Sequence, residues 1–239
     1  MSFAVLFPGQ GSQFVGMGQG VFDERPDLLG DRSDEILGWS LRGLCLHGPE
    51  EQLTRTEHAQ PALFALSYAL WDTLSVRLPQ LPSAAAGHSL GEYTALAAAG
   101  VFDYETALQL VAERGRAMAA AADLEPSGMA ALIGPDEGLA EAIARQRREM
   151  GGRLEVANIN APGQVVVAGG EDDIEWLVSS AGELGVRRVI PLNVAGAFHS
   201  SFMEPASAEV AAALEEVKVS EPRIPVWSNT TAEPHQRDQ

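Results

Sequence analysis

The pattern of apolar and polar positions along the chain predicts short strands that alternate with longer helices. An apolar run from Phe3 to Phe7 indicates a strand near the start, and the small residues 84–86 indicate a second one. Leucines at helical spacing and a candidate capping residue, Asp103, indicate helices between and after these strands. The expected helices begin at Pro61, span residues 90–99, and run from Tyr104 to about residue 121.

The region from Met129 to Val194 predicts elements in the order strand, helix, strand, strand, helix, strand. Their expected ranges are 129–133, 136–150, 154–157, 164–168, 171–184 and 188–194. This order is that of a ferredoxin-like module. We therefore expect a small domain, residues 127–194, inserted into a large domain made of residues 1–126 and 195–239. The chain should return to the large domain with a helix over about 203–217 and a strand over 224–228.

Residues 87–93 read Gly-His-Ser-Leu-Gly-Glu-Tyr and form the most informative motif of the chain. Between a strand and a helix, they predict a nucleophile elbow, a tight turn that exposes the Ser89 hydroxyl. Gly87 and Gly91 would let neighbouring backbone approach closely. The N–H of Leu90, at the helix N-terminus, would point toward an oxyanion on a substrate bound to Ser89. The alternative is that these small residues only pack a strand against a helix.

A nucleophilic serine needs a base and a second oxyanion donor. His199 follows Ser89 at a separation typical of partners that meet only in the folded protein, although a lone histidine can also be structural. His88 adjoins the serine, but at an elbow its side chain should project away from the hydroxyl. The loop 8–11 lacks the lysine of a phosphate-binding loop. It is either a simple tight turn or the source of the second donor, the N–H of Gln10.

Arg114 occupies an unusual position for a charged residue. It shares the apolar face of its expected helix with Ala107, Val111 and Met118. An arginine cannot shed its charge, so it needs an anion to offset its desolvation. It could form a structural salt bridge or extend its head into water, or it could clamp a substrate carboxylate.

Composition narrows the classes of function. The 239 residues are 46% hydrophobic with a net charge of −17, which argues against nucleic acid and anionic membranes as partners. No apolar run approaches the length of a membrane span. The single cysteine, Cys45, lies between two leucines, so we expect a buried structural thiol and a reducing, cytoplasmic setting. No grouping of Cys and His suggests a metal site.

Taken together, several motifs resemble the malonyl-CoA:acyl carrier protein transacylase family, which includes the acyltransferase domains of polyketide synthases. The matching segments cover nearly the whole chain: 7–13, 59–62, 87–93, 113–116, 157–164, 198–199 and 225–229. The resemblance implies a hydrolase-like α/β domain with a short parallel sheet and a nucleophile elbow, plus a ferredoxin-like insertion. This agrees with the organisation expected from the pattern.

The resemblance also implies an activity and the two residues that carry it. Ser89 would be the nucleophile and His199 its base, without a triad aspartate. The serine would take a malonyl group from malonyl-CoA and pass it to the phosphopantetheine thiol of an acyl carrier protein, a ping-pong reaction. No cofactor, metal or redox group would be needed, since coenzyme A enters only as the thioester substrate. The family serves both fatty acid and polyketide biosynthesis.

By position, the resemblance assigns the substrate-binding residues. Arg114 would pair with the malonyl carboxylate, and the N–H groups of Gln10 and Leu90 would form the oxyanion hole. Gln60 would line the site. Phe198, immediately before His199, would border the malonyl α-carbon, since in the polyketide relatives a phenylalanine there accompanies malonyl and a serine methylmalonyl.

Alternatives and one departure accompany this interpretation. Family members usually continue beyond the Ser228-Asn229 strand, so we expect the C-terminal part of the large domain to be incomplete in this sequence. The rival functions are an acyl hydrolase that clears carrier proteins, which would gain nothing from Arg114, and a non-catalytic remnant that only binds them. Carrier proteins are typically acidic, so a basic cluster on the inserted domain could dock them or could simply be solvated. The candidates are Arg145, Arg147, Arg148, Arg153, Arg187 and Arg188.

Overall fold

A computed structural model describes residues 2–236 of the chain. They form two compact units, each with its own apolar core. Unit 1 contains the described residues up to Arg116 and from Val210 onward, and unit 2 is Ala117–Glu209. Unit 2 is larger than the expected insertion, 127–194, because residues on either side of that range pack with it. For example, the Ala197 N–H donates to Ser127 Oγ at 3.1 Å.

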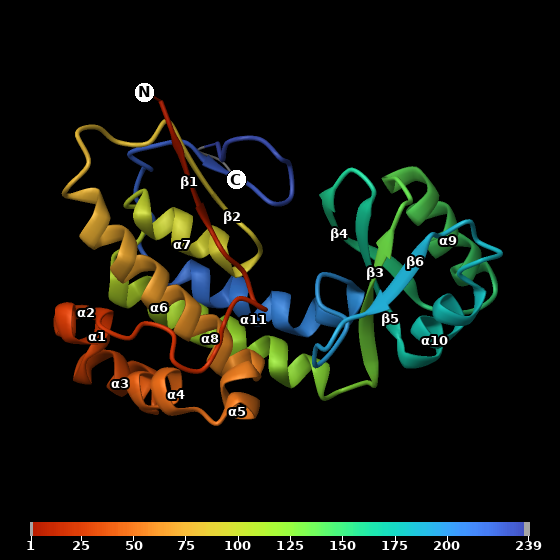
Figure 1. Ribbon diagram of the computed structural model, residues 1–239, viewed down its shortest axis with the longest axis horizontal. Helices are drawn as coiled ribbons and strands as arrows, with labels where there is room; N and C mark the ends of the chain where they lie inside the picture. Colours follow the sequence, from red (N-terminus) through yellow and green to blue (C-terminus); the bar gives the residue numbers. More distant parts are fainter. Residues whose placement is uncertain (1, 237–239) are drawn as a thin grey trace. The chain divides into compact units, whose positions relative to one another are not determined.

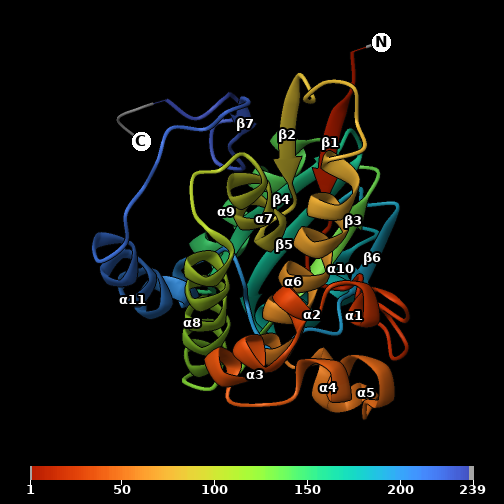
Figure 2. The same cartoon turned by 90° about the vertical axis from the view of Figure 1, so that its left-hand side faces the viewer.

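A short parallel sheet forms the centre of unit 1, as expected for an α/β protein (Figure 1). Its strands are β1 (Ala4–Phe7), β2 (Ala84–Gly87) and β7 (Val226–Trp227), in the order β1-β2-β7. Phe7 lies opposite Gly87, and Ala86 lies opposite Trp227. Helix α7 (Leu90–Ala98) packs on β1 and β2, and their arrangement is clearest in Figure 2. The small side chains of β2 allow this close approach.

Five short helices that the hydrophobic pattern does not predict lie between β1 and the next long helix. They are α1 (Val21–Glu24), α2 (Pro26–Leu29), α3 (Asp31–Leu37), α4 (Leu41–His47) and α5 (Glu50–Thr54). None exceeds seven residues, so apolar spacing cannot establish a helical period in them. No helix in residues 2–236 combines the length and the apolarity needed to cross a membrane.

The start of α6 (Thr56–Ser75) corrects one prediction. The helix was expected to open at Pro61, but it begins at Thr56 and Pro61 lies inside it. Thr56 and Gln60 are each only 1% exposed, and Ala59 is fully buried. Packing of this first stretch outweighs the single intrahelical hydrogen bond that proline removes. The extended helix carries Gln60 into the interior of unit 1.

Helix α8 (Tyr104–Ala122) begins where the sequence predicts. The Asp103 carboxylate accepts the Thr106 N–H at 2.8 Å, which confirms the predicted N-cap. Ala107 and Val111 are fully buried, whereas Arg116 on the opposite face is exposed and paired with Glu113. The face on which Arg114 lies is therefore the packed one.

Unit 2 contains the six elements in the predicted order. They are β3 (Ser127–Ile133), α9 (Glu137–Glu149), β4 (Leu154–Ala161), β5 (Gln164–Gly170), α10 (Glu171–Ser180) and β6 (Arg188–Pro191). The strands form an antiparallel sheet in the order β4-β5-β3-β6. Leu132, Val165 and Val167 face the apolar sides of both helices in one core. After β6 come a 3-10 turn, η1 (Ser201–Met203), and helix α11 (Glu204–Glu215).

Asp173, near the start of α10, ties three parts of unit 2 together. Asp173 is 5% exposed, and its carboxylate accepts hydrogen bonds from Arg147 Nε at 2.6 Å, the Arg153 N–H at 2.9 Å and the Gly170 N–H at 3.1 Å. Arg147 also lies 5.4 Å from the Trp176 ring centroid. One buried carboxylate thus joins α9, the start of β4 and the N-terminus of α10.

We expect Asp173→Ala to lower the stability of unit 2 by roughly 3 kcal/mol, because it leaves Arg147 and two backbone donors without their acceptor. Hydrogen–deuterium exchange should show faster exchange in residues 127–191, with smaller changes in residues 4–116. Asp172→Ala is the matched control, since Asp172 is exposed. Equal exchange in the two variants would contradict this role.

Candidate active site

Ser89 occupies the tight strand-to-helix turn that its motif predicts. Its backbone adopts φ 52° and ψ −108°, a region that costs a non-glycine residue about 1–3 kcal/mol. Two glycines make the turn possible, because a Cβ on Gly87 would lie 1.9 Å from the Gly91 carbonyl carbon. A Cβ on Gly91 would lie 2.4 Å from the Phe7 carbonyl oxygen. Strand, helix and the exit of β1 therefore meet backbone to backbone at this serine.

The Arg114 guanidinium lies against the Ser89 hydroxyl. Its Nη2 donates to Ser89 Oγ at 3.0 Å, and its Nη1 donates to Gln60 Oε1. The Tyr93 ring lies beneath it, 5.5 Å from the guanidinium carbon. α8, α6 and α7 thus each supply one side chain to this cluster. The extended start of α6 is what brings Gln60 into it.

The charge of Arg114 has no carboxylate partner among the described residues. Burial lowers the pKa of Arg114 below its ordinary value, and the nearby Tyr93 and Glu92 offset only part of this effect. Burial likewise raises the pKa of Tyr93, which keeps that phenol neutral. The structural salt bridge considered from sequence is therefore absent from residues 2–236. What remains is a partly buried cation held beside a serine hydroxyl.

The backbone donors near Ser89 differ in what they already bind. The Ser89 N–H donates to Asn229 Oδ1 at 2.7 Å, so it is not available to a bound group. The N–H groups of Leu90 and Gln10 donate to no acceptor within residues 2–236. The Gln10 side chain is directed elsewhere, with Nε2 donating to Thr56 Oγ1 at 3.3 Å. Within residues 2–236, the backbone N–H groups of Gln10 and Leu90 are thus available to meet an oxyanion.

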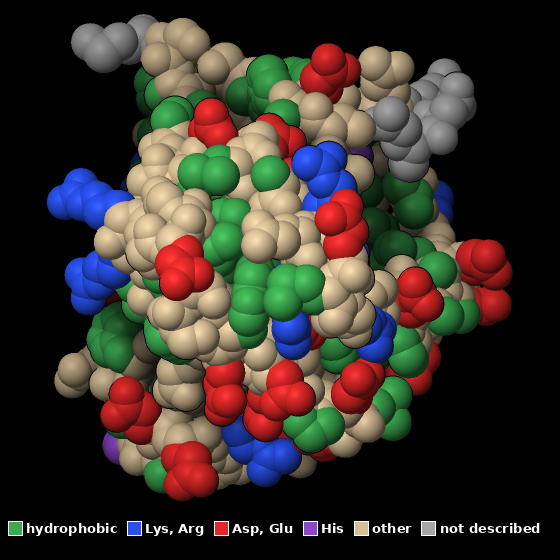
Figure 3. All heavy atoms as spheres, turned by 90° about the vertical axis from the view of Figure 1, so that its right-hand side faces the viewer, with side chains coloured by type: hydrophobic (Ala, Val, Ile, Leu, Met, Phe, Trp, Pro, Cys, Tyr) green, Lys and Arg blue, Asp and Glu red, His purple; other side chains and the backbone are tan. Residues whose placement is uncertain are grey.

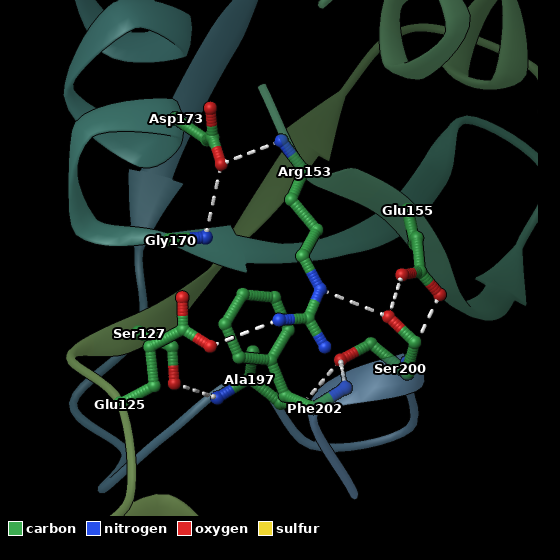
Figure 4. A network of polar contacts seen from close by, with 10 residues as sticks. Glu125, Ser127, Arg153, Glu155, Gly170, Asp173, Ala197, Ser200 and Phe202 are labelled. Carbon is green, nitrogen blue, oxygen red and sulfur yellow. Dashed lines mark hydrogen bonds and ion pairs between the residues drawn. The ribbon is translucent and has the colours of Figure 1, made fainter. Parts of the chain in front are cut away.

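The segment that carries His199 belongs to unit 2. Figure 4 shows polar contacts of its neighbours Ala197, Ser200 and Phe202. His199 is exposed with φ 59°, and Phe198 is 5% exposed. Before His199, the Ala197 N–H donates to Ser127 Oγ at 3.1 Å, and the Ala197 carbonyl accepts the Ser200 hydroxyl at 2.6 Å. After His199, the Ser201 N–H donates to Glu155 at 3.1 Å. The histidine is thus presented by a segment fixed at both ends.

Arg153 completes this network and was not predicted to support it. Its Nε donates to Ser201 Oγ at 3.2 Å, and its guanidinium carbon lies 3.7 Å from the Phe202 ring centroid (Figure 4). It also pairs with Glu125 at 2.9 Å. The sequence singled out Arg153 only as a docking candidate and gave no signal for Glu155, because both reach the histidine segment from strand β4 and its approach.

The arginines considered for docking divide into two groups. Arg147 pairs with Asp173, Arg148 pairs with Glu141 at 2.5 Å, and Arg153 is engaged as described. Within the described residues, Arg145, Arg187 and Arg188 are exposed and have no carboxylate partner. The face drawn in Figure 3 shows basic and acidic side chains interspersed. Half of the candidate cluster therefore supports the fold of unit 2.

Two further features bear on possible chemistry. Cys45 is fully buried, and burial raises the pKa of its thiol to about 12, as expected for a structural residue. No group of three or more His, Cys, Asp or Glu side chains in residues 2–236 is placed to hold a metal ion.

The structure brings five of the predicted site residues together in unit 1. These are Ser89, Leu90, Arg114, Gln60 and Gln10. His199 and Phe198 lie in unit 2, so the pairing of His199 with Ser89 stays a prediction. Asn229 was missed as a contributor to the site, although it ends the predicted 225–229 motif.

Comparisons with known proteins agree with this architecture. The polyketide biosynthesis malonyl CoA-acyl carrier protein transacylase PksC of Bacillus subtilis is 45% identical over 96% of this chain and 78% of its own length. The malonyl CoA-acyl carrier protein transacylase of the same organism is 39% identical over 96% of this chain and 73% of its own length.

Solved structures give the same result. A malonyl-transacylase in complex with a type II polyketide synthase acyl-carrier protein has a TM-score of 0.92 at 35% identity, over 99% of this chain and 77% of that one. The transacylase from Coxiella burnetii has a TM-score of 0.92 at 32% identity, over 99% of this chain and 75% of that one. The family model described as the acyl transferase domain matches residues 4–239. This chain therefore belongs to the acyl transferase domain family.

Proposed function

We propose that the protein is an [acyl-carrier-protein] S-malonyltransferase, which moves a malonyl group from malonyl-CoA to the phosphopantetheine thiol of an acyl carrier protein. The observation that carries this proposal is the Arg114 cation, hydrogen-bonded to Ser89 Oγ at 3.0 Å without a carboxylate partner in the described residues. A serine ester formed there would hold an acyl group whose free end is an anion. The names of the relatives, malonyl CoA-acyl carrier protein transacylases, support the same substrate pair.

In the first half-reaction, Ser89 Oγ attacks the thioester carbonyl carbon while His199 takes the hydroxyl proton. The N–H groups of Leu90 and Gln10 stabilise the oxyanion, and Arg114 binds the malonyl carboxylate through two parallel hydrogen bonds. The C–S bond then breaks, and coenzyme A leaves as the thiol with the proton from His199. The product is a malonyl ester on Ser89.

The second half-reaction reverses these roles with a different thiol. The phosphopantetheine thiol gives its proton to His199 and attacks the ester carbonyl carbon. The ester C–O bond breaks, and the proton returns to Ser89 Oγ. The carrier protein leaves with a malonyl thioester, and the free serine is restored. One base therefore serves both half-reactions, because in each it takes up one proton and gives it back.

We assign the finer fold class on the same basis. Unit 1, with its parallel sheet and elbow, is taken as a hydrolase-like domain, and unit 2 as a ferredoxin-like insertion because its elements follow the order strand, helix, strand, strand, helix, strand. The proposed partners are malonyl-CoA and an acyl carrier protein, with neither nucleic acid nor membrane. The proposed reaction uses no metal or redox cofactor, and the lone buried thiol fits a reducing, cytoplasmic setting.

The rival functions receive less support from the site. An esterase that clears acyl chains would place an apolar chain against the Arg114 cation, at a desolvation cost. A remnant that only binds carrier proteins would have no need to keep Ser89 in its strained conformation. Neither rival accounts for a cation beside the hydroxyl.

The proposal is tested by intact-protein mass spectrometry after brief exposure to malonyl-CoA. Wild-type protein should gain one malonyl group on Ser89, and Ser89→Ala should gain none. His199→Ala should slow both half-reactions by roughly 10²–10⁴-fold, the usual effect of losing a positioned base. Malonylation of Ser89→Ala at the wild-type rate would overturn the assignment.

Removing the cation should change acyl selectivity. Arg114→Ala should lower kcat/KM for malonyl-CoA by about 10²-fold and leave acetyl-CoA less affected, because only the malonyl group carries a carboxylate to bind. Arg116→Ala is the matched control, since it lies on the exposed face of the same helix. If both variants keep the wild-type malonyl-to-acetyl ratio, Arg114 does not recognise the carboxylate.

Phe198 should restrict branching at the α-carbon. Its ring would leave no room for an α-methyl group, and overpacking of this size corresponds to roughly 10–200-fold discrimination. Phe198→Ser should therefore narrow the gap in kcat/KM between methylmalonyl-CoA and malonyl-CoA, measured in competition. An unchanged ratio would place the steric restriction at another residue.

A further inference from the structure

The side chain of Asn229 bridges the two peptide groups that flank His88 in the elbow. Its Oδ1 accepts the Ser89 N–H at 2.7 Å, and its Nδ2 donates to the Gly87 carbonyl at 2.7 Å. Both ends of one planar amide are therefore used on the turn that presents the nucleophile.

This bridge repeats the hydrogen-bond pattern of the parallel sheet. In a parallel pair, a residue on one strand bonds the carbonyl before and the N–H after the residue opposite it. Strand β7 pairs with β2 in the register Ala86 to Trp227, and the same register extended would place Asn229 opposite His88. The backbone pairing ends at Trp227, and the Asn229 amide supplies the next bond pair in place of a peptide group.

Asn229 is itself held from the helix side of the elbow. Its backbone N–H donates to Glu92 Oε2 at 3.0 Å, and Glu92 Oε1 lies 2.6 Å from His235 Nε2. Glu92 belongs to the first turn of α7, and its own N–H donates to the Ser89 carbonyl at 3.1 Å. Asn229 thus connects the end of β2, Ser89 and the start of α7.

We propose that Asn229 is a positioning residue for Ser89, an inference that rests on the proposed role of Ser89 as nucleophile. The backbone torsions of Ser89 set the direction of its hydroxyl and, through the following peptide, of the Leu90 N–H. The Asn229 amide holds those torsions in a region that serine does not favour. It also occupies the Ser89 N–H, which leaves the Leu90 N–H as the oxyanion donor of the turn.

The effect of losing Asn229 should fall on rate rather than on stability. Asn229 is exposed, so water can solvate the two elbow groups once the side chain is removed, and no buried polar group is stranded. A relaxed turn, however, would displace the hydroxyl from its line of attack, and a displacement of about 1 Å can cost 10²-fold in rate. The Arg114 guanidinium donates to Gln60 and to the Ser89 hydroxyl rather than to Asn229, so binding of the malonyl carboxylate should be retained.

The experiment uses the full chain with Asn229→Ala, Asn229→Asp and the control Thr230→Ala, which removes an exposed neighbouring side chain. Single-turnover malonylation by malonyl-CoA should slow by about 10–100-fold in Asn229→Ala, with the half-saturating malonyl-CoA concentration unchanged. Asn229→Asp keeps an acceptor for the Ser89 N–H but loses the donor to Gly87. Its malonylation rate should therefore fall between those of Asn229→Ala and the wild type. Thr230→Ala should match the wild type.

Two further readouts separate the outcomes. Exchange of the Ser89 amide proton, measured by NMR, should accelerate in Asn229→Ala and not in Thr230→Ala. Labelling of Ser89 by a fluorophosphonate, which needs the elbow but no malonyl group, should slow in parallel with malonylation. Wild-type rates of malonylation and labelling in Asn229→Ala would overturn the inference. A wild-type protein that takes the fluorophosphonate but not malonyl would contradict the proposed function instead, and the labelling rates would still decide the role of Asn229.

Discussion

The candidate site depends on backbone atoms of β2, α7 and the end of β1 meeting with no side chain between them. A single Cβ on Gly87 would lie 1.9 Å from the Gly91 carbonyl carbon, a distance that no packing adjustment can accommodate. The close approach of the Gly87 and Gly91 backbones forces the chain to turn sharply at Ser89, and Ser89 therefore adopts an unfavourable φ. The exposed hydroxyl, the direction of the Leu90 N–H and the reach of Asn229 all follow from that turn.

Electrostatics determines what the turn can be used for. Arg114 is carried into the packed face of α8 by its apolar neighbours, and there it contacts Gln60, Tyr93 and Ser89. Because none of these groups is an anion, the guanidinium keeps an unpaired charge whose most favourable partner is a carboxylate. The same burial that lowers the pKa of Arg114 in the free protein would therefore favour an acidic acyl group.

The two units contribute to the proposed chemistry by different means. Unit 1 supplies the nucleophile, cation and backbone donors on elements that form one core. Unit 2 supplies His199 on an irregular segment, and regular structure alone does not hold that segment. Side chains from β4 and its approach do so instead, through Glu155 and Arg153 (Figure 4). Of the arginines that could dock a carrier protein or simply be solvated, Arg153 thus supports this segment and Arg147 supports the fold of unit 2.

The sequence by itself determined the features that depend on neighbours along the chain. Local residue spacing predicts the elbow motif, the Asp103 cap, the order of elements in unit 2 and the helix face on which Arg114 lies. Only the tertiary structure decided the start of α6 before Pro61, the five short helices, and the partners of Arg147, Arg153 and Asn229. These depend on burial and on hydrogen bonds between residues far apart in sequence, such as Asn229 and Ser89, and such contacts leave no period in the chain.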